Sequence, residues 1–135
     1  MIVACLQKRQ ARVLVVEDVA VNQSVIKAML RKFGVVADVA DNGREAVQML
    51  EKGSYDVVLM DVQMPVMDGI AATRVIRDET SAVLDHGAII VATTAHAMKG
   101  DEKLCLEAGM NDYLTKPIRP RQLAEMLAKW LLPRG

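Results

Sequence analysis

Short apolar runs alternate with amphipathic segments along almost the whole chain. The first run, RVLVV, is continuous, as is typical of a strand buried on both faces. The runs predict five strands, at 12–16, 35–40, 56–60, 88–93 and 112–116. The segments between and after them carry apolar residues at helical spacing and predict five helices, at 21–33, 43–53, 70–79, 98–109 and 121–132. This alternation indicates an α/β fold, a parallel sheet with helices on both faces.

The length of 135 residues suits one domain with a substantial core. We expect that domain at 12–132, preceded by a linker or N-terminal extension at 1–11 and followed by a short tail at 133–135. The apolar start of the chain is too short for a signal peptide or a membrane span. We therefore expect a cytoplasmic domain that does not insert into a membrane.

The charges of the chain are balanced. Lys and Arg together number 17, as do Asp and Glu. A neutral chain has no electrostatic basis for binding nucleic acid or an anionic membrane surface. We therefore expect no direct nucleic-acid binding.

Carboxylates follow two of the predicted strands at their carboxyl ends, the edge where open parallel sheets bind ligands. Glu17 and Asp18 end the first strand, and Asp61 ends the third. Three carboxylates packed together repel one another unless a cation compensates them. Oxygen ligands without a nearby His or Cys favour Mg²⁺, with Mn²⁺ as the alternative. A single strand-end acid would be read as a turn or helix cap, but three at one sheet end favour a metal site.

The last two strands add a hydroxyl and an ammonium group to the same edge. Thr94 follows the fourth strand, and Lys116 ends the fifth. With the acid cluster they would surround a phosphoryl group, whose transfer needs mainly positioning and charge neutralisation. Asp61 is the candidate nucleophile, since carboxylates can form acyl phosphates.

Four motifs stand at the expected strand ends: VVED at 15–18, LMDVQMPVMDG at 59–69, TTAHA at 93–97 and DYLTKP at 112–117. Together they resemble the receiver domain of two-component response regulators. The strings VNQ (21–23) and TAHAM (94–98) are similar in particular to receivers of hybrid sensor histidine kinases. The resemblance implies a flavodoxin-like, doubly wound sheet with strand order 2-1-3-4-5.

The resemblance also implies how a phosphoryl group would be received. Asp61 is expected to be the phosphoacceptor, which takes the group from a phosphohistidine. The Mg²⁺ ligands are expected to be the carboxylates of Glu17, Asp18 and Asp61 and the backbone carbonyl of Gln63. Thr94 and Lys116 are expected to bind the phosphoryl oxygens.

Further positions match residues that shape and switch the site in this family. Tyr113 matches the switch aromatic, which turns inward as Thr94 moves toward the phosphate. The Lys116-Pro117 bond matches a cis position, and X-Pro bonds are where the cis form is least costly. Pro65 and Gly69 belong to the loop over the site, with Gly69 expected to allow a positive φ. His96, two residues past Thr94, is expected either to border the site or to lie on the surface.

The expected partners are a histidine kinase or a histidine phosphotransfer domain. Val19 departs from the family, since many hybrid-type receivers carry Asn there. Val19 and Ala20 would either contribute to a docking patch for the phosphotransfer partner or pack under the loop. Signalling, and dimer formation if it occurs, are expected through the face made by the fourth predicted helix, the fifth strand and the fifth helix.

Two other functions share parts of this pattern. A phosphatase of the haloacid dehalogenase type also uses a strand-end aspartate, but it needs a second acid where Gln63 stands. A flavodoxin-like binding module would need a phosphate-binding loop after the first strand, where an acid pair stands instead. Neither His86 nor His96 lies in the helical H-box context of a kinase, so we expect no kinase activity from this chain. It would promote only its own phosphorylation and slow autodephosphorylation, either as a free regulator or as part of a hybrid histidine kinase.

Overall fold

The structure is a computed structural model that describes residues 2–62, 64, 66–95 and 99–132. Its sheet has five parallel strands in the order β2-β1-β3-β4-β5, which confirms the expected topology. The strands are β1 (Arg12–Val16), β2 (Val36–Ala40), β3 (Val57–Asp61), β4 (Ile89–Thr94) and β5 (Asp112–Thr115). Their bounds lie within one residue of the predicted ones.

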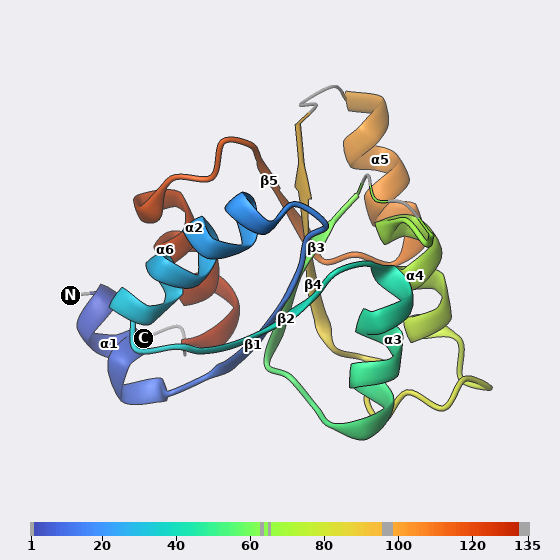
Figure 1. Ribbon diagram of the computed structural model, residues 1–135, viewed down its shortest axis with the longest axis horizontal. Helices are drawn as coiled ribbons and strands as arrows, with labels where there is room; N and C mark the ends of the chain where they lie inside the picture. The colour runs from blue at the N-terminus through green and yellow to red at the C-terminus, as the bar shows by residue number, and fades with distance from the viewer. Residues whose placement is uncertain (1, 63, 65, 96–98, 133–135) are drawn as a thin grey trace.

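The described residues form six helices, which cover the two faces of the sheet. They are α1 (Ile2–Arg9), α2 (Ala20–Lys32), α3 (Gly43–Lys52), α4 (Gly69–Arg77), α5 (Lys99–Ala108) and α6 (Pro120–Leu131). Figure 1 shows α1, α2 and α6 on one side of the sheet and α3, α4 and α5 on the other. The last five are the predicted helices, so the expected helix count of five is wrong by one.

Successive residues of the central strands point to opposite faces, which produces two hydrophobic clusters. Val13, Val15 and Leu59 pack toward α1, α2 and α6, together with Leu30 and Leu127. The other cluster lies against α3, α4 and α5, and it includes Leu14, Val16, Val58, Met60, Leu50 and Ile76. Because both faces are buried, the strands read as continuous apolar runs.

The sixth helix lies where a linker was expected. Leu6 of α1 is fully buried in the cluster with α6, at 0% exposure. Arg9 forms an ion pair of 3.0 Å with Asp56, and Gln7 Nε2 donates to the Lys32 carbonyl at 3.1 Å. These contacts dock α1 onto the amino-terminal end of the sheet and onto α2. The domain boundary at residue 12 remains a prediction.

The turns at the site are shaped by short polar residues. Asn42 begins α3, where its Oδ1 accepts from the Glu45 amide at 2.9 Å, and Asp68 begins α4, where its Oδ1 accepts from the Ala71 amide at 2.8 Å. Each is a side-chain N-cap, which stabilises a helix start by satisfying an unpaired amide.

Within the described part of the chain, no helix is both long and apolar enough to span a membrane.

Candidate functional site

The strand register brings the predicted site residues to one edge of the sheet. Val16 of β1 pairs with Met60 of β3, and Asp61 pairs with Thr93 of β4. Thr94 in turn pairs with Thr115 of β5. The three connected pairings place Glu17, Asp61, Thr94 and Lys116 at the same level, at the carboxyl ends of their strands.

Three carboxylates lie together at this edge. Glu17, Asp18 and Asp61 each offer an oxygen within 4.8 Å of the others. Glu17 and Asp61 are buried, whereas Asp18 is exposed. Carboxylate oxygens suit a hard divalent cation, so the donor set fits Mg²⁺ and gives no position to a soft metal.

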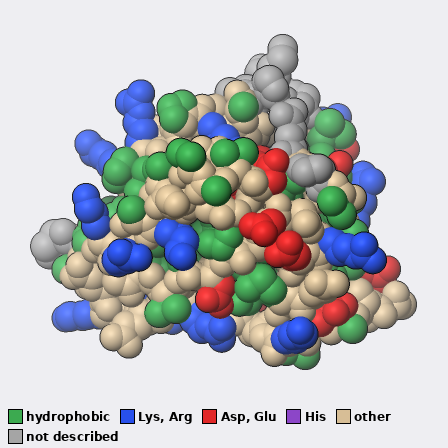
Figure 2. Space-filling model, in the orientation of Figure 1, with side chains coloured by type: hydrophobic (Ala, Val, Ile, Leu, Met, Phe, Trp, Pro, Cys, Tyr) green, Lys and Arg blue, Asp and Glu red, His purple; other side chains and the backbone are tan. Residues whose placement is uncertain are grey.

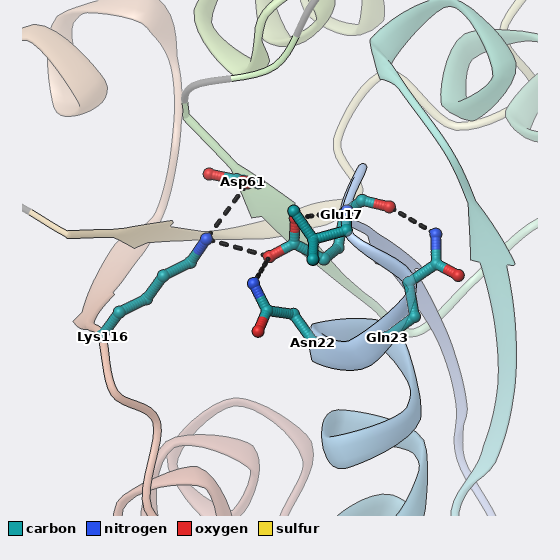
Figure 3. A network of polar contacts seen from close by, with 6 residues as sticks. Glu17, Asn22, Gln23, Asp61 and Lys116 are labelled. Atoms are coloured by element: carbon teal, nitrogen blue, oxygen red, sulfur yellow. Dashed lines mark hydrogen bonds and ion pairs between the residues drawn. The ribbon is translucent and has the colours of Figure 1, made fainter.

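Lys116 joins the acids across the sheet edge (Figure 3). Its Nζ lies 2.9 Å from Glu17 Oε1 and 3.1 Å from Asp61 Oδ2. The ammonium group therefore offsets part of the charge of two buried carboxylates in the metal-free protein. Charge-assisted hydrogen bonds of this kind are stronger than neutral ones, so they hold the three side chains together.

The buried acids affect one another's ionisation. Burial raises the pKa of Asp61 to about 6, and contact with Glu17 adds to this while Lys116 opposes it. Burial also acts to raise the pKa of Glu17, but hydrogen bonds with Lys116 and Asp61 outweigh it and lower the value to about 2. Asp61 is thus the member of the pair that holds a proton more readily without a metal.

A family model described as response regulator receiver domain matches residues 13–128. The chain belongs to this family. It is 43% identical over 125 residues to the sensor histidine kinase GacS of Pseudomonas protegens, a match that covers 93% of this chain and 14% of GacS. The chain therefore corresponds to a small part of that relative.

Solved receiver structures are similar over most of the chain. One is the receiver domain of the sensor histidine kinase PA1611 from Pseudomonas aeruginosa, with magnesium coordinated in its active site cleft. It is 44% identical with a TM-score of 0.80, and the match covers 90% of this chain and 97% of that one. Another is the receiver domain of Ssk1 from Saccharomyces cerevisiae, solved with the histidine phosphotransfer protein Ypd1. It is 34% identical with a TM-score of 0.80, and covers 90% of this chain and 89% of that one.

Two amides of this receiver domain contact Glu17, and the sequence analysis did not assign them a role. Asn22 Nδ2 donates to Glu17 Oε1 at 3.2 Å. Gln23 Nε2 donates to the Glu17 carbonyl at 2.5 Å and to Asp41 Oδ1 at 2.8 Å. The string VNQ, which contains both residues, indicates a similarity to hybrid-kinase receivers and predicts no contact with Glu17. The signal that could have found them is polar residues in the first turn of the helix that directly follows the acid pair.

Position 69 requires a glycine for a different reason from the expected one. Gly69 is the first residue of α4, and the described glycines with positive φ are Gly34 and Gly109. The expected positive φ at Gly69 is therefore wrong. A Cβ at Gly69 would instead overlap the backbone carbonyl of Asp61 and approach Met60 Cγ at 2.9 Å. The receiver domain needs glycine there so that α4 can begin directly against the strand that carries Asp61.

Thr94 and Tyr113 lie on the side of the site nearest β5. Thr94 is buried, and its carbonyl accepts from the Lys116 amide at 2.7 Å. Tyr113 is half-buried, and a hydrogen bond with the Glu102 carboxylate of α5 raises the pKa of its hydroxyl. Tyr113 therefore connects β5 to α5 in this receiver domain.

The remaining predicted positions divide into two groups. The Lys116-Pro117 bond is cis, and Val19 is 46% exposed. Gln63, Pro65 and His96 lie outside the described residues. Val21 and Val25, on the first two turns of α2, are exposed as well. Figure 2 shows hydrophobic side chains around α2 and acidic side chains near the centre of the same face.

Proposed function

We propose that this receiver domain accepts a phosphoryl group on Asp61 from a phosphohistidine, with Mg²⁺ bound beside it. The observation that carries the proposal is the bridge from Lys116 Nζ to Asp61 Oδ2 at 3.1 Å and to Glu17 Oε1 at 2.9 Å. A nucleophile, a metal-binding acid and a phosphate-binding cation, contributed by three strand ends, thus already touch one another.

The transfer itself needs one bond to form and one to break. An oxygen of the Asp61 carboxylate attacks the phosphorus, and the phosphorus–nitrogen bond to the imidazole breaks. The imidazole keeps the electron pair of that bond, and Asp61 becomes an acyl phosphate. Lys116 Nζ and the Thr94 hydroxyl would bind the transferred oxygens and hold them in line.

The carboxylates of Glu17, Asp18 and Asp61 would hold the cation, with Gln63 as the proposed carbonyl ligand. Bound there, Mg²⁺ supplies charge neutralisation for the phosphoryl oxygens. The donor chemistry supports the assignment, because all three side chains offer oxygen and lie within 4.8 Å of one another. The structure of the PA1611 receiver, with magnesium coordinated in its active site cleft, supports it. Mn²⁺ has the same ligand preference and is the alternative ion.

Phosphorylation is proposed to be read out through α5, β5 and α6. Thr94 and Lys116 flank the phosphoryl position, and Tyr113 links β5 to Glu102 of α5. Movement of Thr94 toward the phosphate would make room for Tyr113 to turn inward and release that link. The same face is the proposed surface for a dimer. The output is a stoichiometric switch that loses its phosphate slowly.

The phosphodonor is proposed to be a histidine phosphotransfer domain or a histidine kinase. Three exposed valines, Val19, Val21 and Val25, lie at the start of α2, close in the chain to Glu17 and Asp18. We call these three residues the valine surface. A pocket of about 370 Å³ continues it between α2 and Pro117. The Ssk1 receiver, solved with Ypd1, shows that a related domain binds a partner of this kind. By similarity to GacS, the parent protein is proposed to be a hybrid kinase acting from the cytoplasm.

Incubation with labelled acetyl phosphate tests the proposal without a partner protein. The wild-type domain should incorporate label when Mg²⁺ is present and lose incorporation with a chelator. Asp61→Asn should abolish labelling, whereas Asp68→Asn, which alters a nearby N-cap carboxylate, should retain it. Full labelling of the Asp61→Asn protein would refute the assignment.

A further inference from the structure

The Glu17 carboxylate is held by three protein donors. Its Oε1 accepts from Lys116 Nζ at 2.9 Å and from Asn22 Nδ2 at 3.2 Å, and its Oε2 accepts from the Val19 amide at 3.2 Å. The residue is 2% exposed, so water is a minor source of replacement donors. Loss of any one donor would leave a buried charge with incomplete hydrogen bonding, which is costly.

The two donors on Oε1 differ in what else they do. Lys116 is a long side chain that also reaches Asp61 Oδ2 at 3.1 Å. When Asp61 carries a phosphoryl group, as proposed above, the ammonium is drawn to the phosphoryl oxygens because these bear more negative charge. Asn22 has a short side chain on the first turn of α2, and among the described residues its amide donates to Glu17 alone (Figure 3).

The position of Asn22 is not explained by helix capping. The N-cap residue of α2 is Val19, and no side chain caps that helix start. The Asn22 amide instead points at the acid cluster, and the adjacent Gln23 fixes the Glu17 backbone through the carbonyl hydrogen bond of 2.5 Å. Both amides therefore act on Glu17, one on its side chain and one on its backbone.

We propose that Asn22 is a positioning residue that keeps the Glu17 carboxylate in place when Lys116 moves to the phosphoryl group. The inference rests on the proposed phosphorylation of Asp61. In the free domain Lys116 and Asn22 share Oε1, so loss of Asn22 is partly compensated. In the phosphorylated domain, Asn22 is the remaining side-chain donor to the Glu17 carboxylate among the described residues. The loss of Asn22 should therefore destabilise mainly the phosphorylated domain.

The test compares two binding constants in the same protein. Isothermal titration calorimetry measures Mg²⁺ binding to the free domain, and then the binding of beryllofluoride, a phosphoryl mimic, in saturating Mg²⁺. For Asn22→Ala we expect an Mg²⁺ affinity within about twofold of wild type. The beryllofluoride affinity should fall about tenfold, the effect of one hydrogen bond to a charged group. Ser24→Ala, two residues later on an exposed position of α2, should change neither constant.

A second variant covers the case in which Asn22→Ala folds poorly. Asn22→Asp keeps the side-chain shape but replaces the donor by an acceptor, so the ratio of beryllofluoride to Mg²⁺ affinity should fall further than in Asn22→Ala. Equal losses of both affinities, or no loss of either, would overturn the role assigned to Asn22. If the wild-type domain binds no beryllofluoride, the proposed function fails as well. If the wild type binds it and the Asn22 variants bind it equally well, only the role of Asn22 fails.

Discussion

Lys116 Nζ lies 3.1 Å from Asp61 Oδ2, although 55 residues separate them in the chain. Asp61 ends β3 and Lys116 directly follows β5, and the two strands are separated in the sheet by β4. The contact exists because the carboxyl ends of parallel strands meet at one edge. Under the proposed function, this positive charge would lie beside the phosphoryl oxygens, and it would compete with a metal ion for the same carboxylate.

Replacement of Lys116 should separate metal binding from phosphoryl transfer. In Lys116→Met the ammonium no longer competes with a cation for Asp61 and Glu17, so Mg²⁺ affinity should rise about threefold or more. Phosphorylation by acetyl phosphate should slow about a hundredfold, because a group that stabilises the developing charge is lost. Calorimetry and initial rates of labelling measure the two effects. Weaker Mg²⁺ binding in the variant would contradict the competition.

The raised pKa of Asp61 predicts a pH-dependent stability difference. Burial raises this pKa to about 6 from the ordinary value of 3.8. Between those pH values the folded protein holds a proton that the unfolded chain has lost, so stability falls as pH rises. Without metal, Asp61→Asn should therefore be more stable than wild type by about 2 kcal/mol at pH 7.5. The two proteins should converge near pH 4.

Glu17 contributes with the opposite sign. Its lowered pKa stabilises the folded protein above its ordinary value, and this contribution is lost as pH falls toward about 2. One cause of the lowered pKa is the hydrogen bond with Asp61. The amide of Asp61→Asn can donate the same bond, so the Glu17 contribution is retained in the variant and leaves the difference between the two proteins unchanged. Urea denaturation across the pH range measures that difference, and saturating Mg²⁺ should shrink or reverse it by binding the folded wild type. A wild type more stable than the variant at pH 7.5 without metal would contradict the prediction.

Gly69→Ala should damage the site and the fold together. The added Cβ overlaps the Asp61 carbonyl, so the start of α4 must shift away from β3. We expect a loss of about 2 kcal/mol in the free energy of unfolding, typical of overpacking, and slower phosphorylation by acetyl phosphate. Gly53→Ala is the matched control, because a Cβ there meets no atom within 4 Å. Equal stabilities for the two variants would show that the close approach at Gly69 is unimportant.

Most of the fold could be predicted because two patterns are clear in this sequence: continuous apolar runs for the strands and apolar residues at helical spacing for the helices. The strands are apolar on both faces, and α3 and α4 each begin with a side-chain cap followed by a glycine. The helix α1 could not be predicted in this way. It has eight residues, a length that is marginal for an isolated helix, and its stability comes from contacts with α2, α6 and Asp56. Such contacts connect distant parts of the chain, and local periodicity does not record them.

The site was predictable where residue type alone defines the chemistry. Strand-end acids, a threonine and a lysine suggest a phosphoryl site, and the register places them together. Asn22 and Gln23 were assigned no role because polar residues on an exposed helix turn usually face solvent. The reason for a glycine at position 69 was not predictable, since the sequence cannot show that the backbone of another segment lies where a Cβ would be.

The buried side chain of α1 should make this helix part of the folded unit. Leu6 is 0% exposed, so Leu6→Ala should lower the free energy of unfolding by about 2 kcal/mol or more. Val3→Ala on the same helix, where the side chain is 36% exposed, should cost less than about 1 kcal/mol. Urea denaturation measures both. Wild-type stability for Leu6→Ala would mean that α1 is not docked in solution.

The valine surface should matter for a protein donor and not for a small one. Val19→Glu places a charge on that surface, so transfer from a phosphorylated histidine phosphotransfer domain should slow about tenfold or more. Labelling by acetyl phosphate should change far less. Val36→Glu, a similarly exposed valine on β2 at the other end of the sheet, is the control. Unchanged transfer kinetics in Val19→Glu would remove Val19 from the docking surface.

The central claim is that Asp61 carries the phosphoryl group, and chemical trapping tests it most directly. The wild-type domain is phosphorylated with acetyl phosphate and Mg²⁺, reduced with borohydride, and digested for peptide sequencing by mass spectrometry. Borohydride reduces an acyl phosphate at the carboxyl carbon, so a reduced side chain at position 61 is the predicted result. Reduction at Glu17, Asp18 or Asp68 instead, or phosphate retained on a histidine, would contradict the account.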